Sequence, residues 1–297
     1  MSASYLRDLV ADASSDAAPR PILSERVATY TARMTGSPEH ADVLGPLIVP
    51  DTDLPSVQAC LVDGAPPLDI AVAVTGGAGA IEPAVRWAAR LQGVRLAGLV
   101  TTVRDLDDLA RGAHRVAAMV SQLDAEGLLE DVSVQVALPL YARVAGVQRW
   151  QHALDTLATE DLGLLLRTGG EDAEDVPSPE TLAGAISDAL DREVRFGCIG
   201  DLAHAIAWRA PDGDRLRYGF LDVLLATRAS LDGDDVPAVA ERLTRTSAEA
   251  VADDLATVGE PALESARRWF TGFGSEDVDA SLADLRALSL LPAAPTD

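Results

Sequence analysis

Residues 69–103 read DIAVAVTGGAGAIEPAVRWAARLQGVRLAGLVTTV, and this stretch decides the fold class. It opens with a β-rich run, Asp69–Val74, that stops at Thr75-Gly76-Gly77. A helical pattern then covers Ala80–Leu91, and a second apolar run covers Val94–Val103. A strand, a helix and another strand in this order form the unit that connects parallel strands in a buried sheet.

The same alternation continues on both sides of this unit. Further short apolar runs lie at Leu47–Val49, Val132–Leu138, Leu162–Leu166 and Val194–Phe196, and Thr271–Ser275 could add a short strand near the end. Amphipathic helical segments separate most of these runs. Six to eight parallel strands without a nucleotide fingerprint predict an α/β fold of the (β/α)8 TIM-barrel type. A doubly wound sheet with a helical C-terminal cap is the alternative.

The glycine-rich loop Gly76-Gly77-Ala78-Gly79 resembles a phosphate loop only superficially. A dinucleotide fingerprint needs a third glycine at position 82, which is Glu82 here. We therefore expect no bound dinucleotide, and nothing else in the sequence calls for a cofactor.

The domain boundaries follow from where this alternation starts and stops. Residues 1–44 are polar and Ala-rich, with helical periodicity at Tyr5–Ala13 and Ser24–Met34, and they predict an N-terminal helical extension. Residues 45–291 are expected to form the barrel domain, whose C-terminal end is rich in helices. Residues 292–297 are expected to be a tail.

The chain contains no lysine. All 24 basic side chains are arginines, against 47 acidic residues. A Schiff base with a carbonyl substrate or with pyridoxal phosphate needs a deprotonatable amine, so that chemistry is excluded. The lysines of phosphate-loop hydrolases and of protein kinases are missing for the same reason.

The charge and the remaining composition restrict the partners. A formal net charge of −23 repels phosphate backbones and anionic membrane surfaces, so we expect neither nucleic acid nor a membrane as a partner. Cys60 and Cys198 make no disulfide framework, and no signal peptide or membrane span is evident. These features favour a cytoplasmic protein, and the Ala/Leu-rich helical C-terminus could supply the face of a homodimer.

Arg167-Thr168-Gly169-Gly170 follows directly after a predicted strand, where a parallel barrel has its active face. Arginine offers a planar fork for a carboxylate or a phosphate, and the glycines let backbone N–H groups approach an anion. We therefore expect these four residues to bind a ligand, although an arginine above an ordinary tight turn is the simpler alternative. The acidic run Glu171–Asp175 is interpreted as a solvated loop rather than a metal site.

The segment Arg195–His204 at the end of the next strand holds three reactive types of side chain. They are the Cys198 thiol, the Asp201 carboxylate and the His204 imidazole, and we take them as the candidate catalytic residues. Cys198 and His204 lie six residues apart, a spacing that does not guarantee contact. Asp201 and His204 would share one face of a helix, but Asp201 fits equally well as the N-cap of a helix over Leu202–Arg209.

Four segments together resemble a family of functionally unassigned bacterial β/α-barrel proteins. The segments are Leu166–Gly170, Phe196–Ala205, Tyr218–Ala226 and Phe270–Ser275, and the resemblance covers mainly residues 160–291. The family pattern reads roughly K-[FL]-R-T-G-G, F-K-x-T-A-G-L-H-H, H-G-F-L-N-V-L-L-A and F-T-x-F-G-S. The resemblance implies a barrel fold and carries no activity.

The departures from that pattern concern its reactive side chains. Leu165 and Gly197 stand where the family pattern has lysines, and Ala203 stands where it has the first histidine of a pair. Asp222 replaces an asparagine, and Tyr218 replaces a histidine. Two nearby lysines on barrel strands are the arrangement that class I aldolases use, so an active site of that type would be lost here.

Three functions are compatible with these observations. The first is a lyase- or isomerase-like enzyme for a small anionic or carbonyl metabolite, with Arg167 as the anchor and His204 or Asp201 as the proton carrier. The second is a catalytically degenerate barrel that binds a ligand or a partner protein. The third is a metal-assisted hydrolase with Asp201, His204 and Asp222 as ligands, although no metal-binding spacing supports it and we expect no metal. Asp222 is otherwise expected to bind ligand at the barrel mouth.

Overall fold

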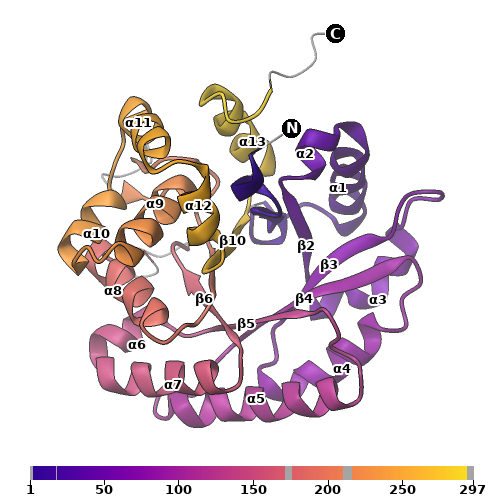
Figure 1. Ribbon diagram of the computed structural model, residues 1–297. Coiled ribbons are helices and arrows are strands. Elements are labelled where there is room, and N and C mark those ends of the chain that lie inside the picture. Colours follow the sequence, from indigo (N-terminus) through magenta and orange to yellow (C-terminus); the bar gives the residue numbers. More distant parts are fainter. Residues whose placement is uncertain (1–2, 18, 171–175, 210–215, 293–297) are drawn as a thin grey trace.

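The computed structural model describes residues 3–17, 19–170, 176–209 and 216–292, and its centre is a closed β/α-barrel (Figure 1). Within these residues, eight parallel strands follow one another around the barrel, and the last of them pairs with both β7 and β1. The barrel strands are β1 (Val10–Asp12), β2 (Leu44–Pro50), β3 (Leu68–Val74), β4 (Val94–Thr102), β5 (Ser133–Ala137), β6 (Gly163–Arg167), β7 (Phe196–Ile199) and β10 (Phe270–Ser275). The predicted (β/α)8 TIM-barrel class is confirmed.

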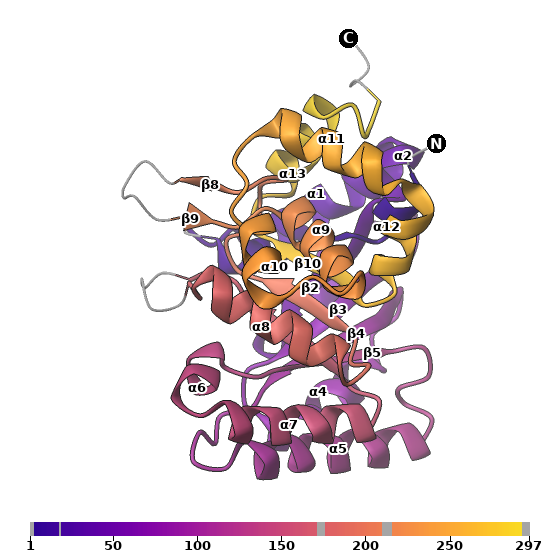
Figure 2. The same ribbon diagram turned by 60° about the vertical axis from the view of Figure 1, so that its left-hand side comes forward.

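Helices surround the strands (Figure 1). They are α1 (Leu23–Gly36), α2 (Pro38–Ala41), α3 (Leu54–Val57), α4 (Ala78–Ala88), α5 (Leu109–Ala125), α6 (Leu140–Ala145), α7 (Val147–Thr159), α8 (Pro179–Leu190), α9 (Phe220–Leu231), α10 (Val236–Arg242), α11 (Ala248–Val258), α12 (Glu260–Arg267) and α13 (Val278–Ala287). Side-chain caps start several of them: Asp108, Ser178, Asp235, Ser247 and Asp277 each accept a backbone N–H of the first turn. Figure 2 shows α5 and α7 packed side by side along one side of the barrel.

The long loop between β7 and α9 carries a separate two-stranded antiparallel sheet. Its strands are β8 (Trp208–Arg209) and β9 (Leu216–Arg217). Figure 2 shows this hairpin projecting from the same side of the molecule as the start of α8. The loop therefore lies beyond the carboxyl ends of the barrel strands, the side on which barrels carry their functional sites.

The two faces of each barrel strand have different side chains. In β3, Ile70 and Val72 join the large core between strands and helices, whereas Ala71 faces the barrel interior. In β6, Leu164 and Leu166 join the large core and Leu165 faces inward. Large side chains therefore fill the outer layer, and small ones fill much of the interior.

A compact apolar layer closes the barrel interior. It consists of Ala13, Ile48, Ala71, Leu165 and Ile199, and all five side chains are buried. Gly274 fits beside this layer because a Cβ there would lie 3.0–3.2 Å from atoms of Ala13, Ile48 and Ile199. Toward the amino ends of the strands, the small interior residues leave a cavity of about 370 Å³.

The structure corrects the predicted domain boundaries. Residues 1–44 are not a separate helical extension, because Val10–Asp12 forms β1 and closes the barrel between β10 and β2. The helix predicted over Tyr5–Ala13 is therefore wrong, whereas the one predicted over Ser24–Met34 is present as α1. A strand of three residues is too short to show the alternation by which strands are recognised.

The C-terminal end is rich in helices, as expected. Two of them, α10 and α11, are separate, and Ser247 caps the second. Of the predicted tail, residues 293–297 lie outside the described residues. No helix in the described part of the chain is long and apolar enough to cross a membrane.

The interior layer gives a stability prediction. Leu165→Ala should lower the free energy of unfolding by about 2–5 kcal/mol, because Leu165 is 5% exposed and the change leaves a cavity. Urea denaturation measures the difference. Val144→Ala is the control, since Val144 is 72% exposed and its truncation should change stability by no more than about 0.5 kcal/mol. Equal effects of the two substitutions would contradict the assigned interior position.

Candidate functional site

The ends of β6 and β7 meet in a tight contact that involves most of the predicted ligand-binding motif. The Thr168 hydroxyl donates to the Gly200 carbonyl oxygen at 2.6 Å, and the Thr168 N–H donates to the Ile199 carbonyl oxygen at 2.9 Å. Gly200 has φ +97°, and a Cβ there would lie 2.4 Å from the Gly169 carbonyl oxygen. Thr168 therefore joins the two loops through its hydroxyl and its N–H, and Gly169 packs against Gly200, so an anion-binding role of these two residues stays a prediction.

Asp201 completes this contact. Its Oδ2 accepts the Gly170 N–H at 3.2 Å and forms an ion pair with Nη1 of Arg217 at 2.6 Å. Its own N–H donates to a carboxylate oxygen of Glu276, and burial raises the pKa of Glu276 above its ordinary value. Asp201 and Gly170 are thus committed to each other, which corrects their expected catalytic and ligand-binding roles.

The helix predicted over Leu202–Arg209 does not form. Asp201 has φ +53°, and the chain after it runs as an irregular loop into β8. Asp201 consequently caps no helix and shares no helix face with His204. The hydrophobic periodicity of the sequence could not show that this segment is a loop, because contacts with residues far away in the chain hold it in place.

Cys198 does not lie at the barrel mouth. Its neighbours in β7, Gly197 and Ile199, are on the interior face, so the Cys198 side chain points outward into the large core. It is 1% exposed, and burial raises the pKa of its thiol. A buried thiol with a raised pKa is inert, so the catalytic role predicted for Cys198 is wrong.

Asp222 also has a structural position. It lies in the first turn of α9, is 0% exposed, and accepts the Ala207 N–H through Oδ2 at 2.6 Å. Burial raises its pKa to about 8, which the Ala207 hydrogen bond partly opposes. Asp222 therefore holds the β7–α9 loop and is not accessible to a ligand, contrary to the expectation.

Arg167 is the member of the motif that faces solvent. It follows Leu165 by two residues on the interior face of β6, and its side chain is exposed. Among the described residues, nothing forms a hydrogen bond or ion pair with its guanidinium. It lines a pocket of about 560 Å³ with walls from the ends of β4, β5 and β6 and from the start of α8: Thr102, Ala137, Leu138, Pro139, Leu140, Tyr141, Val144, Val176, Pro177, Ser178 and Thr181.

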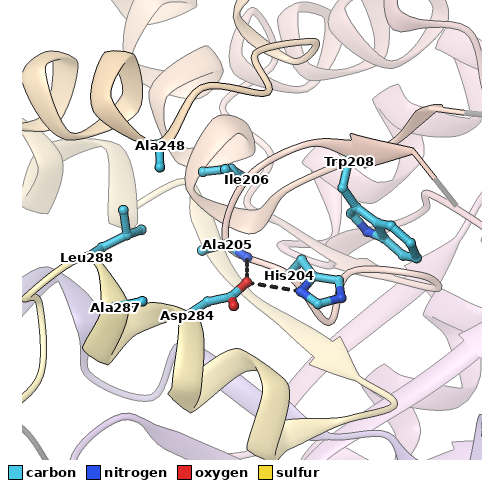
Figure 3. Close-up of a pocket in the computed structure, with 8 residues that line it drawn as sticks. All are labelled: His204, Ala205, Ile206, Trp208, Ala248, Asp284, Ala287 and Leu288. Atoms are coloured by element: carbon cyan, nitrogen blue, oxygen red, sulfur yellow. Dashed lines mark hydrogen bonds and ion pairs between the residues drawn. The ribbon is translucent and has the colours of Figure 1, made fainter.

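His204 pairs with a residue that no sequence motif had identified. Its Nδ1 lies 3.0 Å from Oδ2 of Asp284, and the same oxygen accepts the Ala205 N–H at 2.9 Å (Figure 3). Asp284 lies on α13, eighty residues further along the chain. The two side chains line a pocket of about 320 Å³ that also includes Trp208.

The predicted site residues are therefore distributed over two pockets and a structural contact. Arg167 and His204 line different pockets. The three ligands of the metal-assisted hydrolase hypothesis, Asp201, His204 and Asp222, each engage a different partner. No group of three or more His, Cys, Asp or Glu side chains in the described ranges is arranged to hold a metal, and Glu171–Asp175 lie outside those ranges.

No protein-family model matches this chain, and no curated protein is significantly similar to it. The two pockets are accordingly characterised by their own geometry. The Arg167 pocket has one exposed cation and mostly apolar walls, whereas the His204 pocket has an imidazole, a carboxylate and an indole.

The contact between the two loops predicts a sensitivity to a single methyl group. In Gly169→Ala the new Cβ would lie 2.4 Å from Oδ2 and 2.5 Å from Cβ of Asp201, so the loops must separate. We expect a loss of about 1–3 kcal/mol of unfolding free energy, measured by urea denaturation. Gly79→Ala is the matched control, because its Cβ meets nothing within 4 Å. A Gly169→Ala protein as stable as this control would refute the contact.

The buried carboxyl of Asp222 predicts a pH dependence. Its pKa is raised to about 8 in the folded chain, so the native state binds more protons than the unfolded state between about pH 4 and pH 8. This group therefore lowers stability as the pH rises through that window. Asp222→Asn stays neutral, so its stability relative to the wild type should improve from pH 5 to pH 9 in urea titrations. A difference that does not change with pH would show that Asp222 is already ionised.

Proposed function

We propose that this protein binds a small molecule with a carboxylate or phosphate group and an apolar body at the Arg167 pocket. The observation that carries the proposal is the exposed guanidinium of Arg167 at the carboxyl end of β6, which has no partner in the part of the chain that the structure describes. A guanidinium can donate two parallel hydrogen bonds to a carboxylate or a phosphate. Its place at a strand end suits a ligand, because ligands of barrel proteins bind on this face.

Arg167 is distinguished by its place in a pocket at a strand end, because exposed arginines elsewhere, such as Arg115 and Arg149, also lack an ion-pair partner among the described residues. Other arginines are engaged. Arg217 is paired with Asp201, and Arg104 donates to the Thr75 carbonyl oxygen. Arg26 is buried and donates to the Ile48 carbonyl oxygen. Among the described residues Arg167 has no acidic partner, so its guanidinium keeps a charge with which an anion can pair.

The walls of the pocket suit the apolar part of the ligand. Tyr141 is 58% exposed and Val144 is 72% exposed, and both border the pocket together with Leu138, Leu140 and Val176. Large apolar side chains left open to water beside a charged anchor are typical of a ligand site. A volume of about 560 Å³ accommodates a molecule the size of a common metabolite.

Binding without catalysis is favoured over lyase or isomerase chemistry in this pocket. Its described lining residues include no carboxylate, imidazole or thiol, and the Tyr141 phenol is the side chain among them that could carry a proton for a bound substrate. His204, the remaining candidate for that role, lines the other pocket. The alternative in which the chain is a catalytically degenerate barrel that binds a ligand is therefore the one the geometry supports best.

Calorimetric titration with benzoate and phenyl phosphate tests the proposal. Both should bind, and the neutral benzyl alcohol should bind more weakly, because it offers no charge to Arg167. Arg167→Gln should weaken binding of both anions about tenfold to a hundredfold, since a hydrogen bond to a charged group contributes about 1.5–3 kcal/mol.

Arg195→Gln is the matched control for the same loss of charge. Arg195 is an exposed arginine that pairs with Asp161 at 3.2 Å, and it does not line this pocket. Its substitution should leave the affinity for both anions unchanged. If the affinity for the anions falls equally in Arg167→Gln and Arg195→Gln, the loss is due to the change in net charge, and Arg167 is rejected as the anchor.

A further inference from the structure

The pocket beside His204 is distinct from the Arg167 pocket. It lies between the β7–α9 loop, the start of α11 and the last turns of α13 (Figure 3). Its lining comprises His204, Ala205, Ile206, Trp208, Ala248, Asp284, Ala287 and Leu288, none of which borders the Arg167 pocket. A volume of about 320 Å³ is enough for a small ligand.

The Asp284 carboxylate determines the role of each imidazole nitrogen. A carboxylate can only accept, so Nδ1 of His204, 3.0 Å away, must carry the proton. In the neutral imidazole, Nε2 is then an acceptor. Within the described residues Nε2 has no hydrogen-bond partner, and it points away from Asp284 (Figure 3).

Trp208 adds an aromatic face to the same pocket. Its ring lies 4.8 Å from the His204 ring, centre to centre, at an interplanar angle of 71°. This edge-to-face contact fixes both rings, and the face of an indole attracts cations. Ile206, Ala248, Ala287 and Leu288 supply apolar walls on the other sides.

The electrostatics of the pocket select against anions. Its described lining contains one carboxylate and no arginine, and the chain carries a net charge of −23. The Asp284 carboxylate and Nε2 of His204 both accept hydrogen bonds, whereas the Nε1–H of Trp208, a donor, is buried. A complementary ligand therefore donates hydrogen bonds and carries a positive charge.

We propose that this pocket is a second ligand site, for a small amine with an apolar body. Its ammonium group donates an N–H to Nε2 of His204 and lies against the face of Trp208, near the negative charge of Asp284. Its apolar part contacts Ile206, Ala248 and Leu288. This pocket is proposed to prefer cations and the Arg167 pocket to prefer anions, so the two proposals can be tested independently of each other.

A series of three ligands of equal size but different charge tests the site. Benzylamine, benzyl alcohol and benzoate are titrated in a slightly alkaline buffer, in which imidazole is neutral and the amine is protonated. Calorimetry gives the affinity, and the part of the tryptophan fluorescence change that is lost in Trp208→Phe reports occupancy of this pocket, because the chain has 4 tryptophans. We expect benzylamine to bind at least tenfold more tightly than benzyl alcohol and to change the fluorescence, whereas benzoate should leave it unchanged. A fluorescence response to benzoate that exceeds the response to benzylamine would overturn the proposal.

Variants assign the binding to named residues. His204→Phe and Asp284→Asn should each weaken benzylamine binding at least tenfold, and His152→Phe, the same change at an exposed histidine outside the pocket, should not. Ala248→Phe fills the pocket without altering the His204–Asp284 pair and should abolish benzylamine binding. This variant keeps the proposal testable if His204→Phe does not fold. Unchanged benzylamine affinity in Ala248→Phe would reject this pocket. Arg167→Gln should leave benzylamine binding intact while benzoate binding falls.

Discussion

Ile48, Leu165 and Ile199 contact one another inside the barrel, and this apolar contact restricts where the protein can bind a polar ligand. The layer separates the small-residue cavity near the amino ends of the strands from the mouth at their carboxyl ends. A polar ligand cannot enter it without losing its hydration, a cost that nothing in the layer offsets. Polar recognition is therefore confined to the strand ends and to the loops beyond them.

The contact between Thr168, Gly169, Gly200 and Asp201 organises that region. It holds the β6 and β7 ends together with three hydrogen bonds from Thr168 and one from Gly170. Arg167 precedes this contact and His204 follows it in the chain, so one rigid junction positions both pockets. Within the motif Arg167–Gly170, the last three residues thus have a structural role in joining the two loops. Arg167 is the residue of the motif whose side chain is exposed.

The sequence predicted the barrel better than the sites, and particular residues show why. Seven of the strands can be recognised in the sequence as apolar runs between helices, whereas Val10–Asp12 is too short to be recognised in this way. The direction of Cys198 follows from alternation once the inward face is known, but the sequence alone does not say which face that is. Asp284 could not be found, because its contact with His204 joins segments eighty residues apart through a loop that no periodicity describes. Arg167 was found because a strand end followed by glycines is a local signal.

The absence of lysine acquires a structural meaning at Leu165 and Gly197. The resemblance suggested by the sequence would place lysines at these two positions, and in the structure they are register partners on neighbouring strands, both on the interior face. Leu165 belongs to the apolar layer, and a Cβ at Gly197 would lie 2.7 Å from the amide nitrogen of Gln135. That amide is itself fixed by a 2.9 Å hydrogen bond to the Thr271 hydroxyl. A side chain at residue 197 would therefore displace the hydrogen bond between Gln135 and Thr271. The barrel interior is thus packed in a way that leaves no space for a lysine at this position. This packing gives the barrel axis a structural role and agrees with placing the two proposed ligand sites at Arg167 and beside His204.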